Sequence, residues 1–160
     1  MSTSLTPSSS AEPILCDTSF ISVVQVKGWL PTWPAETQQR LSSAILGISV
    51  ITIAEVRDGH ISASWGQARR TAAEQLMAAY LWVPLDMAVV NECARLRAAC
   101  RTSGVVVPDN DIWIAATANT RGWPLVSCDK HFERIPEVDH IFLDPPARAP
   151  KSSPARRRAR

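Results

Sequence analysis

The segment PDNDIWIAATA, residues 108–118, places two aspartates, Asp109 and Asp111, at the start of an apolar helical pattern. Residues three, four and seven positions after Asp111 share its face of a helix. They are Ile114, Ala115 and Ala118. An ionised carboxylate on an apolar helix face is costly unless a cation lies beside it. The segment therefore indicates that a cation binds near Asp111.

Three further acids follow segments that are typical of buried strands. They are Asp17 after ILC, Asp129 after PLVSC, and Glu55 in the first turn of the helix after ILGISVI. Ligands of open parallel sheets bind beyond the carboxyl ends of the strands, so we expect these acids to meet Asp111 at one sheet edge. Their motifs hold no Lys or Arg that would neutralise four carboxylates. Because oxygen ligands suit hard cations, the sequence predicts a Mg²⁺ or Mn²⁺ site.

Each acid also has an explanation without a metal. Thr52 to Glu55 form a capping box, and for this tetrad alone capping is the favoured interpretation. Asp109 fits a helix N-cap, where the helix dipole favours an acid. Asp17 and Asp129 fit turns. Any one acid is weak evidence for a metal, whereas four acids at corresponding positions are much stronger.

The elements that must position these acids alternate along the chain. We expect strands at 14–16, 45–51, 81–85, 124–128 and 140–143, with Pro84 indicating an edge strand. We expect helices at about 35–44, 64–80, 86–102 and 110–120, and a helical turn at KHFERI. A further helix is expected to begin after an N-cap at Thr52 and to stop at Gly59. This alternation predicts an α/β fold, a three-layer α/β/α domain with a parallel sheet of about four or five strands.

The composition divides the chain into one domain and two tails. We predict a single domain at residues 13–144, a disordered N-terminal extension at 1–12 and a disordered basic tail at 145–160. All fifteen acids precede residue 145, so residues 1–144 carry a net charge of −4, whereas the tail holds six basic residues. The tail is equally compatible with a contact to nucleic acid and with no partner at all.

Other features favour ordinary structural roles. The four cysteines (Cys16, Cys93, Cys100 and Cys128) are interpreted as buried thiols, and the three histidines (His60, His131 and His140) as surface or loop residues without metal-ligand spacing. Most of the six tryptophans are expected in the core, although Trp29 and Trp33 could form an apolar patch for a partner helix. No apolar run is long enough to cross a bilayer, and no secretory signal is recognised, so we expect a cytoplasmic protein.

The order of the motifs LCDTSF, ITIAEVRDG, PDNDIWIAATA and LVSCDKHFERIP resembles the PIN domain, and specifically the VapC-type toxins of toxin–antitoxin pairs. The resemblance spans roughly residues 14–144. It implies an endoribonuclease that hydrolyses RNA phosphodiester bonds with Mg²⁺ or Mn²⁺. It also implies a cognate VapB-type antitoxin and a homodimer.

By this resemblance, Asp17, Glu55, Asp111 and Asp129 are the catalytic, metal-binding acids, with Asp17 and Asp111 the strongest matches and Asp111 a better match than Asp109. Ser127 matches a hydroxyl that lies behind the metal ligands in the family. The attacking water would be activated by the metal, so no histidine base is needed. Arg57 could contact a phosphate, but an exposed helix arginine is the simpler interpretation.

Two other functions remain open at this stage. The first is a non-catalytic PIN-like protein that acts only in an antitoxin complex during DNA-binding autorepression, which the intact set of four acids disfavours. The second is a phosphatase or phospho-acceptor domain, which should have a lysine near its last strand. HIFLD offers none, and the nearest candidate is Lys130.

Overall fold

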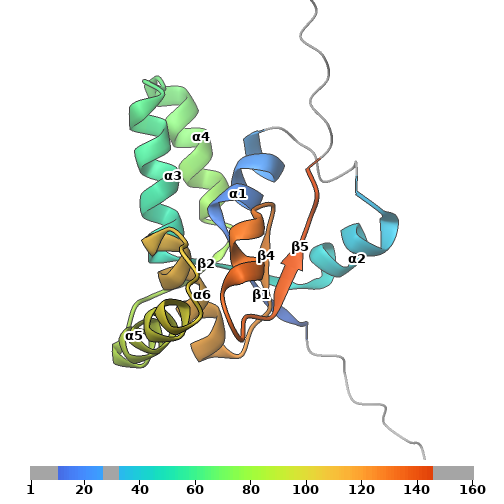
Figure 1. The fold of residues 1–160 in the computed structure, drawn as a ribbon. Coiled ribbons are helices and arrows are strands. Elements are labelled where there is room, and N and C mark those ends of the chain that lie inside the picture. Colours follow the sequence, from blue (N-terminus) through green and yellow to red (C-terminus); the bar gives the residue numbers. More distant parts are fainter. Residues whose placement is uncertain (1–10, 27–32, 146–160) are drawn as a thin grey trace, which may run out of the picture.

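The computed structural model describes residues 11–26 and 33–145, in which five parallel strands form one sheet (Figure 1). The strands are β1 (Pro13–Cys16), β2 (Ile45–Ser49), β3 (Leu81–Val83), β4 (Leu125–Ser127) and β5 (His140–Phe142), in the order β3-β2-β1-β4-β5. The predicted α/β class and parallel sheet are confirmed. The segment before Pro84 is an edge strand, as predicted, and it ends at Val83.

Helices connect successive strands. They are α1 (Thr18–Ile21), the π-helical segment η1 (Ser22–Val26), α2 (Ala35–Ser43), α3 (Val50–Ser62), α4 (Gln67–Met77), α5 (Met87–Thr102), α6 (Asp109–Arg121) and the 3₁₀ helix η3 (Lys130–Arg134). The helix α6 ends at Gly122, whose φ of 65° closes the helix in the left-handed conformation that glycine adopts without strain.

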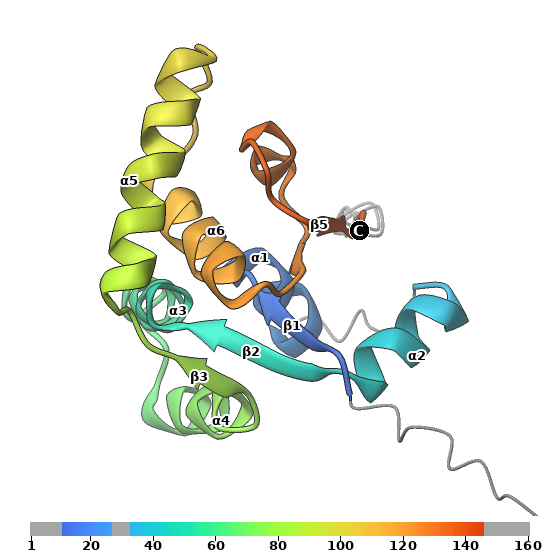
Figure 2. The ribbon, with the colours of Figure 1, turned by 90° about the horizontal axis from the view of Figure 1, so that it is seen from below.

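The sheet separates two apolar clusters, so the domain has three layers. Along β1, Ile14 and Cys16 belong to one cluster and Leu15 to the other, because side chains alternate along a strand. The cluster around Leu15 contains residues of α5, α6 and η3, and the opposite cluster contains residues of α1, α2, α3 and α4. Figure 2 shows α5 and α6 on the side of β2 opposite to α4. β1 is therefore buried on both faces, as expected for a central parallel strand.

The start and end of α3 differ from the sequence prediction. The N-cap is Ser49, whose Oγ accepts a hydrogen bond from the Thr52 backbone N–H at 3.0 Å. The predicted N-cap Thr52 is instead buried inside the first turn. The helix also continues past Gly59 to Ser62, so the predicted stop is wrong. One exposed glycine lowers helix propensity by only about 1 kcal/mol, which packing of Ile53 and Val56 can offset.

Two of the predictions for the tryptophans need correction. Trp33 is not part of a surface patch: it stacks on Phe20 with centroids 5.9 Å apart, and its Nε1 donates to the Asp144 carbonyl. Trp82 lies on the surface, 46% exposed. Trp29 and the predicted tails, apart from residues 11, 12 and 145, lie outside the described residues. Among the helices of the described ranges, none has the length and apolar character to span a membrane.

The cysteines and histidines follow the prediction only in part. Cys16, Cys93 and Cys100 are buried free thiols, but Cys128 is partly exposed. His60 is buried against Trp65, so the prediction of a surface or loop position is wrong for this residue.

Candidate active site

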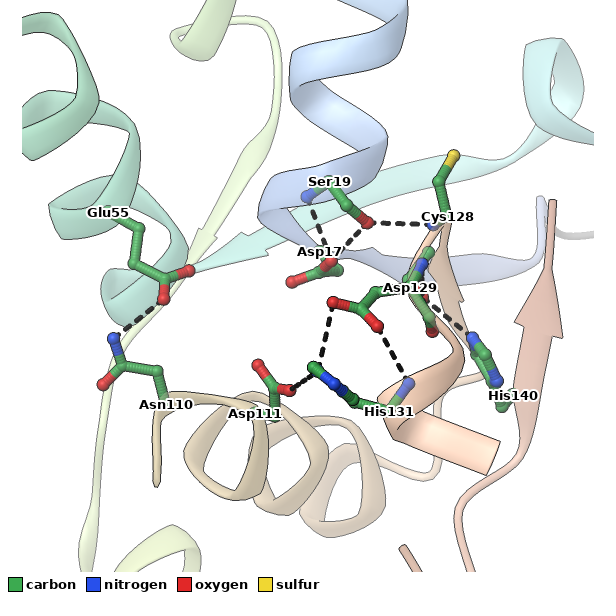
Figure 3. A network of polar contacts seen from close by, with 10 residues as sticks. Asp17, Ser19, Glu55, Asn110, Asp111, Cys128, Asp129, His131 and His140 are labelled. Carbon is green, nitrogen blue, oxygen red and sulfur yellow. Dashed lines mark hydrogen bonds and ion pairs between the residues drawn. The ribbon is translucent and has the colours of Figure 1, made fainter. Parts of the chain in front are cut away.

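The four predicted acids line one pocket of about 500 Å³ beyond the carboxyl ends of the strands. Asp17 directly follows β1, Glu55 lies in α3, Asp111 in the first turn of α6, and Asp129 two residues after β4. Figure 3 shows their carboxylates directed toward a common space. Asp17 and Asp129, which are 112 positions apart in the chain, therefore lie in the same pocket at the edge of the sheet.

Asp17 is held by the turn that opens α1. Its Oδ2 accepts hydrogen bonds from the Ser19 backbone N–H at 3.0 Å and from Ser19 Oγ at 2.6 Å. Ser19 Oγ in turn accepts from the Cys128 backbone N–H at 2.9 Å, which ties β1 to β4. Burial raises the pKa of Asp17, and its hydrogen bonds from Ser19 oppose that rise. The carboxylate is therefore fixed in orientation but is not matched by a positive charge.

Glu55 extends into the pocket and does not fold back onto the start of its helix. Its Oε2 accepts from Thr18 Oγ1, and its Oε1 accepts from Asn110 Nδ2 at 2.8 Å. The capping box favoured for the isolated tetrad is therefore wrong. A helix is capped by whichever oxygen reaches its free N–H groups, and at α3 that oxygen belongs to Ser49.

Asp111 is the pocket acid whose burial is least offset by hydrogen bonds. Its side chain is only 13% exposed, and its buried Oδ2 has no hydrogen-bond partner in the described part of the chain. Burial raises the pKa of Asp111 to about 6, with further increases from Asp17 and Asp129, against which His131 acts. Asp109, two residues earlier, lies on the surface and pairs with Arg97 at 2.5 Å. Asp111 therefore faces the pocket, whereas Asp109 does not.

Asp129 is positioned through its backbone. Ser127 Oγ accepts from the Asp129 N–H at 3.1 Å and donates to the Asp129 carbonyl at 3.0 Å, and it lies 2.9 Å from His140 Nε2. The Oδ1 of Asp129 caps η3 by accepting from the His131 N–H at 2.9 Å. Ser127 therefore supports the turn that carries Asp129 and does not itself line the pocket.

Sequence reasoning missed residues that complete the pocket. Thr18 and Asn110 fix Glu55, and Asp58 lines the wall one turn after it. His131 Nδ1 lies 3.3 Å from Asp111 Oδ2 and 3.3 Å from Asp129 Oδ2. Its position two residues after Asp129, inside a short helical turn, was the available signal for His131. His131 is 42% exposed, as expected of a surface histidine, but the sequence did not predict its place between Asp111 and Asp129.

A divalent cation fits this donor set. The residues that line the pocket include no Lys or Arg, and Arg57 instead pairs with Glu74 on α4 at 2.8 Å. Carboxylate and amide oxygens are ligands that Mg²⁺ and Mn²⁺ accept. Asp111 Oδ2 is buried without a hydrogen-bond partner among the described residues, and a cation would satisfy it.

The PIN-domain family matches residues 14–138 of the chain. Among curated proteins the chain is similar to Ribonuclease VapC4 of Mycobacterium tuberculosis, with 36% identity over 99 residues, which cover 61% of this chain and 76% of that protein. It is also similar to Ribonuclease VapC5 of the same organism, with 33% identity over 106 residues, covering 62% and 78% of the two chains.

Among solved structures, the fold is similar to that in VapBC2 from Rickettsia felis bound to a DNA fragment from its promoter. The TM-score is 0.68, with 19% identity, and the match covers 82% of this chain and 99% of that chain. At this level of identity the likeness concerns the fold alone.

Proposed function

Because this chain belongs to the PIN-domain family, we propose that it is a metal-dependent endoribonuclease and the toxin of a type II toxin–antitoxin pair. Two relatives that share about a third of their residues with it are named ribonucleases. The observation that carries the proposal is the pocket itself. Five carboxylates line it, including the four predicted acids, and no basic residue that lines the pocket neutralises them.

The acids of the pocket would have different roles in binding a cation. Asp17, Glu55 and Asp111 would hold the principal ion, and Asp129 would assist a second ion or orient the attacking water. A bound Mg²⁺ or Mn²⁺ would supply a water of lowered pKa and would offset the charge that develops on the phosphate. Ser19 keeps Asp17 in its rotamer, which fixes the direction in which that carboxylate presents its free oxygen.

The remaining pocket groups orient Glu55 and Asp129. Thr18 and Asn110 hold the two oxygens of Glu55, and Ser127 holds the backbone of Asp129. A pocket that is preorganised in this way loses little entropy when the phosphodiester and the ion bind. The substrate would be RNA, whose phosphate carries the charge that complements a cation held by the acids.

The partners follow from the relatives. A VapB-type antitoxin is the proposed inhibitor, because the similar solved structures include VapBC complexes. A homodimer in the cytoplasm is proposed from the family resemblance. The alternative, a non-catalytic protein that acts only in an antitoxin complex on DNA, is favoured by one observation, the promoter fragment in the Rickettsia felis complex. The complete set of four acids favours catalysis.

The test is RNA cleavage by the purified chain, freed of any antitoxin, with Mg²⁺, with Mn²⁺ and with EDTA. Asp111→Asn keeps the shape of the side chain and removes its charge, and Asp109→Asn is the matched control on the surface of the same helix turn. We expect cleavage by the wild type and by Asp109→Asn, and its loss in EDTA and in Asp111→Asn. Equal cleavage by the two variants would reject the assigned site.

A further inference from the structure

His131 occupies the gap between two of the proposed ligands (Figure 3). Its Nδ1 is 3.3 Å from Asp111 Oδ2 and 3.3 Å from Asp129 Oδ2, and each of the three residues offers a ligand atom within 4.8 Å of those of the other two. Although the ring is 42% exposed, Nδ1 is buried and has no hydrogen-bond partner in the described part of the chain, and the same holds for Asp111 Oδ2. Two buried polar atoms without hydrogen bonds therefore face each other.

The orientation of this ring is set by its own turn. Asp129 Oδ1 accepts from the His131 N–H at 2.9 Å, so one oxygen of Asp129 caps η3 and the other, Oδ2, faces the ring. The next residue, Phe132, is 1% exposed and anchors the turn in the core. The cap from Asp129 and the packing of Phe132 thus fix the backbone of His131 beside the two acids that its Nδ1 contacts.

The distances suit a shared cation better than a shared proton. A hydrogen bond between an imidazolium and a carboxylate is about 2.7–2.9 Å long, which is shorter than either contact. Two ligands that each lie about 2.1 Å from one ion are separated by about 3.0 Å at right angles and by about 3.4 Å at the tetrahedral angle. The observed 3.3 Å lies between these values.

We propose that His131 Nδ1, Asp111 Oδ2 and Asp129 Oδ2 form a mixed nitrogen and oxygen site for a divalent cation, and that His131 makes this site prefer first-row transition ions such as Mn²⁺ over Mg²⁺. An imidazole nitrogen is a softer ligand than a carboxylate and raises affinity along the series from Mn²⁺ to Cu²⁺ more than it raises affinity for Mg²⁺. The role of the bound ion in RNA cleavage rests on the proposed function, whereas the binding of the ion at this site does not.

The first measurement is pulsed electron paramagnetic resonance of Mn²⁺ bound in substoichiometric amount to the full chain. Coordination by an imidazole gives electron spin-echo modulation from ¹⁴N, which carboxylate and water ligands do not give. We expect this modulation in the wild type and in His60→Gln, and we expect its loss in His131→Gln. Bound Mn²⁺ without nitrogen modulation, or modulation that persists in His131→Gln, overturns the inference and leaves the proposed nuclease intact.

The second measurement is calorimetric titration of Mn²⁺ and Mg²⁺ into the same variants. His131→Gln replaces nitrogen by an amide oxygen, so we expect Mn²⁺ affinity to fall by about tenfold while Mg²⁺ affinity changes less. Glu133→Gln, an exposed position of the same turn, is the matched control and should leave both affinities unchanged. An equal loss of affinity for Mn²⁺ and Mg²⁺ in His131→Gln would show that His131 does not determine which ion the site prefers. Absence of binding of either ion to the wild type rejects the metal-dependent function as well.

Discussion

The acids that pair with arginine and the acids that line the pocket differ in their charged neighbours. On the surface Glu12 pairs with Arg40, Glu74 with Arg57, Glu92 with Arg95, Asp86 with Arg121 and Asp109 with Arg97. The hydrogen bond from Arg57 lowers the pKa of Glu74, whereas burial raises the pKa of Asp111. The chain thus pairs five acids with arginine, where the gain in stability is small for exposed groups, whereas no acid that lines the pocket pairs with an arginine in the described part of the chain.

This difference separates stability from function. A surface pair can be removed with little consequence, because water solvates both groups. Without an arginine partner, the pocket carboxylates would destabilise the folded chain until the proposed cation binds, which is typical of sites whose geometry is set by chemistry and not by folding. The following variants test this separation, beginning with the largest expected effect.

Asp17→Asn should lower kcat/KM for RNA cleavage about 10³-fold, which corresponds to about 4 kcal/mol of transition-state stabilisation. The reason is that the amide keeps the cap on Ser19 but removes a charged ligand. Cleavage kinetics at saturating Mn²⁺ measure the effect. Asp86→Asn, at the cap of α5 on the surface, is the control and should retain wild-type cleavage. A comparable loss of cleavage in Asp86→Asn would show that the effect is not specific to acids of the pocket.

The free energy of unfolding of the metal-free chain should fall as the pH rises from about 4 to about 6. In this range the folded chain retains a proton on Asp111 that the unfolded chain has lost, because the folded pKa is raised to about 6 from 3.8. This difference in the pKa of Asp111 between the folded and the unfolded chain corresponds to about 3 kcal/mol. Urea unfolding at a series of pH values measures it, and Mn²⁺ should restore stability above pH 6.

Asp111→Asn is the sharpest control for that experiment. The variant should flatten the pH dependence and should be more stable than the wild type at pH 7 without metal, because it lacks the repelled charge. An unchanged slope between pH 4 and 6 in this variant would assign the dependence to another group.

Ser127→Ala should cost about 1–2 kcal/mol in the free energy of unfolding, since it removes hydrogen bonds to both backbone groups of Asp129 inside the core. Cleavage should fall by about tenfold, because Asp129 loses its support. Thermal unfolding and cleavage kinetics measure the two effects. Ser42→Ala, at an exposed serine of α2, should change neither, and loss of stability without loss of cleavage would limit Ser127 to a structural role.

Arg57→Gln should produce the smallest effect. It removes the pair with Glu74 on exposed helix surfaces, so we expect a loss of less than about 1 kcal/mol in urea unfolding. Cleavage should be unchanged, because Arg57 does not line the pocket. A large loss of cleavage here would instead place Arg57 on the path of the phosphate.

The fold was predictable because its signals are periodic. Apolar segments bounded by turn residues gave the strands, and a parallel sheet follows from their alternation with helices. The acids that follow the ends of strands were correctly predicted to lie together at one edge of the sheet. The N-cap of α3 was not predictable in the same way, because Ser49 and Thr52 are both good caps and the register of β2 selects between them.

The details of the pocket depended on contacts between distant segments. Trp33 is buried because its indole reaches Asp144, 111 positions away, and no local pattern in the sequence contains that contact. His131 contacts Asp111 and Asp129 from the short 3₁₀ helix η3, and helices of this length carry little periodic signal. Asn110 supports Glu55 across 55 positions of the chain. Residue type indicated the ligands, but only tertiary structure identified the groups that orient them.

The central place of β1 in the sheet has a consequence during protein synthesis. β1 lies between β2, which follows it closely, and β4, whose pairing begins at Leu125. A ribosome that adds roughly 5–20 residues per second would expose Asp17 several seconds before Asp129 exists. A nascent chain would therefore have no assembled pocket until Asp129 has been synthesised, so a product that terminates before this residue would lack one of the four acids.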